Sequence, residues 1–184
     1  IPAEPYFIST VGRYYKDKLN PGYAAVVGEY VYSSAYDQGE GWTTFDLFTG
    51  LTKTEGLPYL STYTGAAAPV PVLQLNACGN ALNPRTVGIK INGRQLPDQT
   101  MDFFDSLKAI IPVTVADISS GSAIIDVKNN CPAHNDRMVI AKIEITYART
   151  FNFPVGDPTN NIAFELPASP VAGNYLEITG FGYG

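Results

Sequence analysis

The sequence predicts an all-β protein: a two-sheet antiparallel β-sandwich of the jelly-roll type with about nine or ten short strands. Apolar and polar residues alternate with a period of two along most of the chain, which is the pattern of half-buried strands. The 184 residues include 17 Gly and 14 Pro, so turns are frequent and long helices are disfavoured. A hydrophobic content of 45% is enough for a packed core and argues against a disordered chain. A closed barrel of the same strands is the alternative architecture.

The first strands are expected at 23–33 and 42–48, where β-branched and aromatic residues alternate with polar ones. The next two are expected at 70–77 and 86–91, and the second of these runs directly into Asn92-Gly93. This dipeptide favours a type I′ turn, because both central residues of that turn need a positive φ. A hairpin is therefore expected after residue 91.

The later strands show the same alternation and are expected at 109–116, 122–128, 138–147, 162–166 and 175–181. Pro112 places its strand at a sheet edge or a bulge, since proline has no N–H for a ladder hydrogen bond. Residues 98–108 could form a short helical turn, and a strand is equally consistent with their pattern.

The length corresponds to one domain. We expect a single sandwich over residues 1–184, with 1–22 as an N-terminal lead-in and 180–184 as the stub of a linker. The chain starts at Ile1, and its first residues lack the basic start and apolar stretch of a signal peptide. The sequence is therefore expected to be a mature or trimmed segment of a longer product.

The charge balance disfavours two classes of partner. Twelve Lys and Arg against 17 Asp and Glu give a net charge of −5, so the chain has no basic footprint for nucleic acid or for an anionic membrane. No apolar run of about 18 residues occurs, so no membrane span is expected.

Cysteine and histidine are scarce. One His and two Cys cannot supply a zinc site within the chain. Cys78 and Cys131 could form a disulfide, which would fit an oxidising compartment. The alternative, with equal weight, is a pair of buried thiols, because unoxidised cysteine packs as a small hydrophobic residue.

Nucleophilic catalysis would have to use His134, the single imidazole. It lies three residues after Cys131 in a polar turn, so a Cys–His dyad is conceivable. No glycine-rich oxyanion loop and no strand-to-helix elbow accompany it, so the sequence favours an exposed loop histidine. A hydrolase is therefore kept only as the last alternative.

Asp37 and Glu40 flank Gln38-Gly39 in a glycine-rich turn. Two carboxylates on such a turn could bind calcium, which takes several oxygen ligands from flexible backbone. They could also form an acid–base pair, or simply be solvated acids of the turn. Calcium is the one cofactor that the sequence suggests; otherwise none is expected.

Aromatic residues are plentiful, with 12 Tyr, 9 Phe and 1 Trp. Most fit strands that point half of their side chains into the core. Tyr36, Tyr59 and Tyr63 lie in or near expected loops, and Trp42 begins an expected strand. An exposed ring at any of these positions could stack on a sugar. These four are the candidate ligand-binding residues.

Three segments together resemble one known family. Residues 34–42 (SAYDQGEGW) resemble the "SYDxGEGW" signature of a β-sandwich domain that precedes the peptidase domain in gingipain-like (C25) surface proteins of Bacteroidetes, including the sortase of the type IX secretion system. Residues 72–93 are similar to a strand pair of that domain that ends in "vNG". Residues 138–149 are similar to its "ayldyIeinYpR" strand, and the match extends from about residue 23 to 182.

The resemblance implies a non-catalytic, secreted or cell-surface accessory module of a larger exported protein. Its partner would be a downstream domain of the same polypeptide, or a surface polysaccharide. The catalytic pair of those peptidases belongs to a later domain, so no catalytic residue is carried over. The sequence departs from the family pattern at Cys78 and Cys131. A glycan-binding module that uses loop aromatics is the alternative function.

Overall fold

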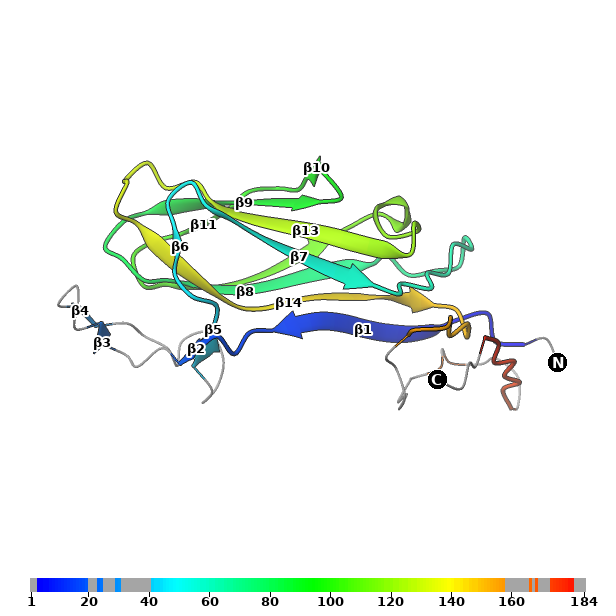
Figure 1. Ribbon diagram of the computed structural model, residues 1–184. Helices are drawn as coiled ribbons and strands as arrows, with labels where there is room; N and C mark the ends of the chain where they lie inside the picture. The colour runs from blue at the N-terminus through cyan, green and yellow to red at the C-terminus, as the bar shows by residue number, and fades with distance from the viewer. Residues whose placement is uncertain are drawn as a thin grey trace.

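The computed structural model describes residues 3–19, 23–24, 29–30, 41–157, 166, 168 and 173–180. Within this part of the chain, two five-stranded antiparallel sheets pack face to face (Figure 1). Sheet I has the order β1 (Phe7–Tyr14), β14 (Arg137–Arg149), β8 (Val72–Gly79) and β12 (Ser106–Pro112), and β6 (Leu47–Phe48) also pairs with β14. Sheet II has the order β10 (Arg94–Gln95), β9 (Arg85–Ile91), β13 (Ser122–Asn129) and β7 (Thr52–Pro58), and β11 (Gln99–Met101) also pairs with β9.

The long strands from β7 onward alternate between the two sheets. The chain passes from β7 in sheet II to β8 in sheet I, then to β9, β12, β13 and β14, changing sheet at every step. The structure therefore confirms the antiparallel β-sandwich of jelly-roll type that the period-two pattern predicted.

The core lies between the sheets and is built from alternate residues of each strand. In β13, Ala123, Ile125 and Val127 have no exposed surface, whereas Ile124 and Lys128 point to solvent. Inward side chains of β8, β9 and β14 complete the same cluster. Each large aliphatic side chain buried in this way contributes about 1.5–3 kcal/mol, which fixes the register of the sheets.

The Asn92-Gly93 turn forms as predicted. Asn92 has φ 47° and Gly93 has φ 81°, the positive values that a type I′ turn needs. The Asn92 side chain donates to the Asp117 carbonyl at 2.6 Å and accepts from the Ile124 N–H at 2.8 Å. The β9–β10 hairpin is thus fastened to the neighbouring loop and strand.

Several expected strands differ in the structure. The single strand expected at 23–33 is wrong, because β3 (Tyr23–Ala24) and β4 (Glu29–Tyr30) pair antiparallel with each other. The segment 42–48 divides into β5 (Trp42–Thr43), which pairs with β2 (Lys18–Leu19), and β6. Residues 98–108 form β11 and the start of β12, so the strand interpretation is the correct one.

The ends of the chain also differ from expectation. Residues 1–22 contain β1, which pairs with β14 along all eight of its residues. The strand at 109–116 ends at Pro112, and Val115–Asp117 form a 3₁₀ turn. In the described part of 175–181, only single bridges occur, from Tyr175 and Thr179. The strand expected at 162–166 lies outside the described residues except for Leu166.

Cys78 and Cys131 are both buried thiols rather than a disulfide. Cys78 lies on the outward side of β8 and donates to the Phe104 carbonyl at 3.4 Å. Cys131 lies in the loop after β13 and donates to the Pro84 carbonyl at 3.3 Å. The two thiols are therefore held by different loops, and the second of the two alternatives from the sequence describes the structure. No helix among the described residues is long and apolar enough to cross a membrane.

Candidate functional site

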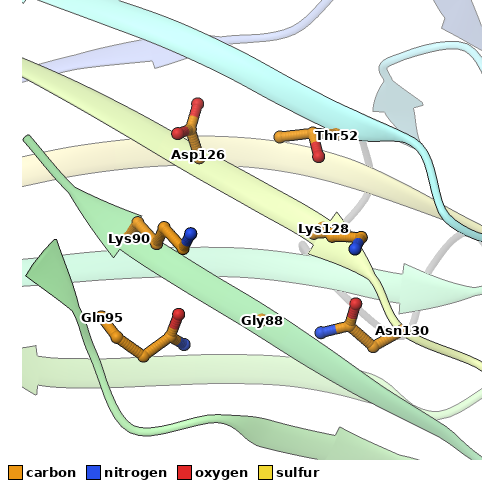
Figure 2. Close-up of a pocket in the computed structure, with 7 residues that line it drawn as sticks. All are labelled: Thr52, Gly88, Lys90, Gln95, Asp126, Lys128 and Asn130. Carbon is orange, nitrogen blue, oxygen red and sulfur yellow. The ribbon is translucent and has the colours of Figure 1, made fainter. Parts of the chain in front are cut away.

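A polar hollow lies on the outer face of sheet II, and we call it the outer-face groove (Figure 2). It encloses about 250 Å³. Seven residues from β7, β9, β10, β13 and the loop after β13 line it: Thr52, Gly88, Lys90, Gln95, Asp126, Lys128 and Asn130.

Strand register brings these residues together. Lys90 of β9 lies directly opposite Asp126 of β13, and Gly88 lies directly opposite Lys128. On the other side of β13, Lys128 faces Thr52 of β7. Lys90 and Lys128 are therefore diagonal neighbours on one face, a relation that places their Cα atoms roughly 7–8 Å apart. The inward neighbours of these residues are core aliphatics, so the backbone beneath the groove is rigid.

Gly88 forms the floor of the groove. A Cβ placed at this residue would lie 2.6 Å from Nδ2 of Asn130. The absence of a side chain therefore lets the Asn130 amide lie over the strand. In Figure 2 the amino groups of Lys90 and Lys128 and the amide of Asn130 surround the Gly88 position.

The positive charges of the groove are unpaired. Neither Lys90 nor Lys128 has an ion pair or a hydrogen bond with any residue that the structure describes. The carboxylate opposite Lys90 points the other way: Asp126 Oδ1 accepts a hydrogen bond from Oγ1 of Thr54 at 2.6 Å. The groove thus offers two ammonium groups with unused donors, and one carboxylate that already has a partner.

The chemistry of this groove is that of binding. Lysine, asparagine and threonine side chains can donate hydrogen bonds to hydroxyl or anionic oxygens. None of its lining residues carries an imidazole or a thiol. Asp126 is the one carboxylate among them, and the Asp98 carboxylate lies close by: its Oδ1 would be 3.9 Å from a Cβ on Gly88 and accepts from Nε2 of Gln95 at 2.8 Å.

The predicted aromatic residues are distributed over the molecule. The Trp42 side chain is 43% exposed on β5, and Tyr59 is 38% exposed directly after β7 with φ 60°. Tyr63 stacks on Tyr6, with ring centroids 5.0 Å apart. One face of the Tyr63 ring is therefore already covered within the protein.

Trp42 and the two tyrosines lie at opposite ends of the sandwich. β5 pairs with β2, just beyond the C-terminal end of β1. Tyr63 donates its N–H to the Ala148 carbonyl, and Ala148 pairs with Ile8 at the start of β1. The six residues of strand between these points span roughly 20 Å. Trp42 and Tyr63 therefore cannot stack on the same sugar ring, and neither lines the outer-face groove.

The remaining predicted sites fall outside what is described. Tyr36, Asp37 and Glu40 lie outside the described residues, so the calcium site at Asp37 and Glu40 stays a prediction. Among the described residues, no group of three or more His, Cys, Asp and Glu is placed to hold a metal ion.

The loop that carries Cys131 and His134 is built around a buried ion pair. Asp136 accepts from Nε and Nη2 of Arg85, both at 2.8 Å, and from the amides of Asn129 at 2.9 Å and Asn83 at 3.2 Å. We call these four residues the Arg85–Asp136 network. The side chains of the ion pair are fully buried. Burial acts to raise the pKa of Asp136, but the hydrogen bonds from Arg85 and Asn129 outweigh it and hold that pKa below its usual range.

The Cys–His dyad is not assembled in this loop. The Cys131 thiol is buried and donates to the Pro84 carbonyl. His134 is exposed beside a wide hollow of about 630 Å³. No hydrogen bond joins the two side chains in the described structure.

No protein-family model and no curated protein matches the chain. Among solved structures, it is similar to dimeric latent PorU from Porphyromonas gingivalis, with a TM-score of 0.53 and 10% sequence identity. The match covers 85% of this chain and 14% of that chain. This likeness confirms the β-sandwich fold that the sequence resemblance implied.

Two carbohydrate-binding modules match with lower scores. The CBM36-1 domain of a multidomain xylanase from the hindgut metagenome of Trinervitermes trinervoides has a TM-score of 0.42 and 14% identity, over 75% of this chain and 95% of that one. A CBM36 module in complex with calcium and xylotriose has a TM-score of 0.40 and 11% identity, over 74% and 98% of the two chains.

The sequence did not single out any residue of the outer-face groove. The pattern does show that Lys90, Asp126 and Lys128 occupy the polar positions of two strands, so their common exposure could have been inferred. Their proximity depends on the register between β9 and β13, and the alternation alone does not specify it.

Proposed function

We propose that this chain is a non-catalytic β-sandwich accessory module of a larger exported surface protein of the Bacteroidetes type. The observation that carries the proposal is the relation to PorU, a type IX sortase, in which 85% of this chain corresponds to 14% of that one. An accessory domain would show this kind of match, in which a single sandwich corresponds to one part of a long multidomain chain. The GEGW-containing segment at 34–42 independently resembles the same kind of protein.

The chemistry of the described residues supports a non-catalytic role. The Cys131 thiol donates to the Pro84 carbonyl, while His134 is exposed and has no hydrogen-bond partner among the described residues. Asp136, two residues after His134, already accepts from Arg85, Asn129 and Asn83. The hydrolase alternative therefore has no support from the geometry of this loop. Full hydrolytic activity that disappears in His134→Ala would reverse this conclusion.

Antibodies against residues 1–184 would test the accessory-module proposal in cells of the source organism. The proposal expects an immunoblot band that corresponds to a protein much longer than 184 residues. This band should disappear when intact cells are treated with a protease. A band of 184 residues, or one that the protease cannot reach, would contradict it. An antibody against a cytosolic protein serves as the control for cell integrity.

Glycan binding is a second candidate function, and the outer-face groove supports it. Hydrogen-bond donors without partners, arranged over a rigid sheet, are suited to the hydroxyl and acidic groups of sugars. The exposed rings of Trp42 and Tyr59 are separate candidates for stacking. If Trp42→Ala or Tyr59→Ala abolishes binding on a glycan array, the site lies at the end of the sandwich that carries the substituted ring. Binding that both variants keep would leave the outer-face groove as the candidate site.

Calcium at Asp37 and Glu40 is part of the same proposal. Carboxylates on a glycine-rich turn are ligands that calcium accepts. A rise in the melting temperature with calcium that EDTA reverses, and that is absent in Asp37→Asn/Glu40→Gln, would support the site. An equal rise in this variant would reject these two ligands.

A further inference from the structure

We propose that the outer-face groove binds an anionic polysaccharide, with Lys90 and Lys128 contacting successive acidic groups along the sugar chain. This inference rests on the second candidate function, glycan binding, and adds the site and the class of ligand. It starts from the charges of Lys90 and Lys128, which make no ion pair or hydrogen bond with described residues that would stabilise the sandwich.

The first argument is the missing counter-charge. Lys90 and Asp126 lie directly opposite each other, in a position where an ion pair between neighbouring strands is normally available. Asp126 instead accepts from Thr54 on the far side, and the Lys90 ammonium has no partner among the described residues. Lys128, facing Gly88, has no acidic side chain directly opposite it. The carboxylates of Asp126 and Asp98 on this face accept from Thr54 and Gln95, so the two ammonium groups stay available to an incoming anion.

The second argument is shape. Gly88 leaves the strand between the two lysines bare, and the Asn130 amide lies beside this gap. A sugar ring could occupy the bare strand while its acidic groups reach the lysines. The side chains of Thr52 and Asn130, which make no hydrogen bond with the described residues, could then bond to ring hydroxyls. The diagonal spacing of the lysines is one that one or two sugar rings span.

Other anionic partners fit less well. The protein has a net charge of −5 and the groove has only two lysines, whereas nucleic acid and lipid surfaces are bound through extended basic patches. A hollow of about 250 Å³ is also too confined for a duplex and is recessed from a flat surface. A single flexible sugar chain suits both the charge and the size.

The test uses the full 184-residue chain and polymers matched except for charge. Polygalacturonate is compared with its carboxyl-reduced neutral form, and dextran sulfate with dextran, by isothermal titration calorimetry at low salt. We expect at least tenfold tighter binding to one or both charged polymers than to their neutral partners, weakening as salt screens the contacts. The two charged polymers distinguish carboxylate from sulfate as the recognised group.

Four variants locate the site. Lys90→Ala and Lys128→Ala should each weaken binding up to about fivefold, as expected for exposed ion pairs. Lys16→Ala removes an exposed lysine elsewhere and should change nothing. Asp126→Asn keeps the acceptor for Thr54 but removes the negative charge, so it should tighten binding two- to fivefold.

Gly88→Val separates binding from folding. Valine suits a strand, so the fold is kept, while its side chain fills the floor of the groove and displaces Asn130. We expect at least a tenfold loss of affinity with an unchanged melting temperature. If Gly88→Val melts early, the Asp126→Asn result still decides, because that change leaves the groove open.

Three outcomes would overturn the inference: equal binding of charged and neutral polymers, the same loss in Lys16→Ala as in Lys90→Ala, or stronger binding to phosphatidylserine vesicles through the same lysines. Neutral-glycan binding that ignores these variants would overturn the groove assignment and leave glycan binding standing. Absence of all glycan binding would overturn the second candidate function too, while the accessory-module proposal would still depend on the cell-surface experiment.

Discussion

Sheet II and the loops at its edge carry two sets of charged side chains, one buried and paired, the other exposed and without a partner among the described residues. In the Arg85–Asp136 network, a fully buried ion pair has every polar atom of the carboxylate engaged by a donor. In the outer-face groove, Lys90 and Lys128 are exposed and have no partner in the described structure. Buried charges must be satisfied because desolvation is costly, whereas exposed charges are stable without a partner and remain available to a ligand. The contrast separates charges that hold the fold from charges that can serve binding.

Asp136→Ala should have the largest effect. It leaves the Arg85 guanidinium buried without its carboxylate and removes the acceptor for two asparagine amides. Removing one partner of a buried pair costs about 3–5 kcal/mol of unfolding free energy. Urea denaturation followed by circular dichroism would measure it. Asp126→Ala, a partly exposed aspartate of the groove, is the control, and its cost should stay near about 1 kcal/mol. Similar losses for both aspartates would contradict the contrast between the two regions.

Acid should remove the stability that the Arg94–Asp117 ion pair contributes. Bidentate hydrogen bonding by Arg94 lowers the pKa of Asp117 to about 2, and the Thr114 N–H and hydroxyl also donate to this carboxylate. A carboxylate whose pKa is lower in the folded state stabilises the protein above its unfolded pKa, and this contribution is lost as the pH falls through the folded value. The unfolding free energy should therefore decline between about pH 4 and pH 2.

Asp117→Asn tests the origin of that decline. The variant should be less stable than the parent at pH 7 by about 0.5–2 kcal/mol, the cost of a lost cap, and the difference should shrink as the pH approaches 2. Guanidinium denaturation at pH 7, 4, 3 and 2 would measure both proteins. A difference that stays constant over this range would show that the Asp117 charge does not contribute. Asp126→Asn, in the groove, is the matched control.

The reactivity of the two thiols should report on the packing around the Arg85–Asp136 network. Burial raises the pKa of Cys78 to about 12, even though the nearby Arg85 acts to lower it, and Cys131 is buried as well. Both should react slowly with Ellman's reagent in the native protein at pH 8, and two thiols per chain should be titrated in urea without reductant. Detection of no thiols would show that the disulfide alternative is correct.

The Asp136→Ala variant sharpens this measurement. The Cys131 N–H donates to the Asn129 side chain, whose amide donates to Asp136, so loss of the carboxylate loosens the Cys131 loop. Cys131 should then react several-fold faster than in the parent, whereas Cys78, held at β8, should change less. Equal acceleration of both thiols would indicate global unfolding instead.

The strands that the sequence predicted are those whose inward face is mostly apolar. β8, β9, β13 and β14 were found because most of their inward residues are hydrophobic, as in Ala123, Ile125 and Val127. β7 was missed because its inward positions include Lys53 and Glu55. Tyr15 satisfies both, since its hydroxyl donates to Glu55 at 2.9 Å and Lys53 lies 5.0 Å from its ring centroid. A strand with a polar inward face depends on a partner far away in sequence.

The candidate sites were harder to predict than the fold. The sequence favoured loop aromatics, but Tyr63 is covered by Tyr6, and the groove is made of ordinary outward residues such as Lys90 and Lys128. Each of these lysines is a normal polar position of its strand. Only the pairing of β9 with β13 makes them neighbours, and that register depends on packing of the whole core.

The smallest expected effect is that of Lys90 and Lys128 on stability. It tests the other side of the contrast between the Arg85–Asp136 network and the outer-face groove. Lys90→Ala and Lys128→Ala remove exposed charges that make no ion pair with described residues, so each should change the unfolding free energy by no more than about 0.5 kcal/mol. Attraction of each lysine to Asp126 and repulsion between the two lysines act in opposite directions, so the change should stay small at low salt and shrink further as salt screens both. Urea denaturation at low and high salt would measure this. A loss of unfolding free energy comparable to that in Asp136→Ala would mean that the lysines stabilise the fold. Their charges would then not be available to bind a ligand in the groove.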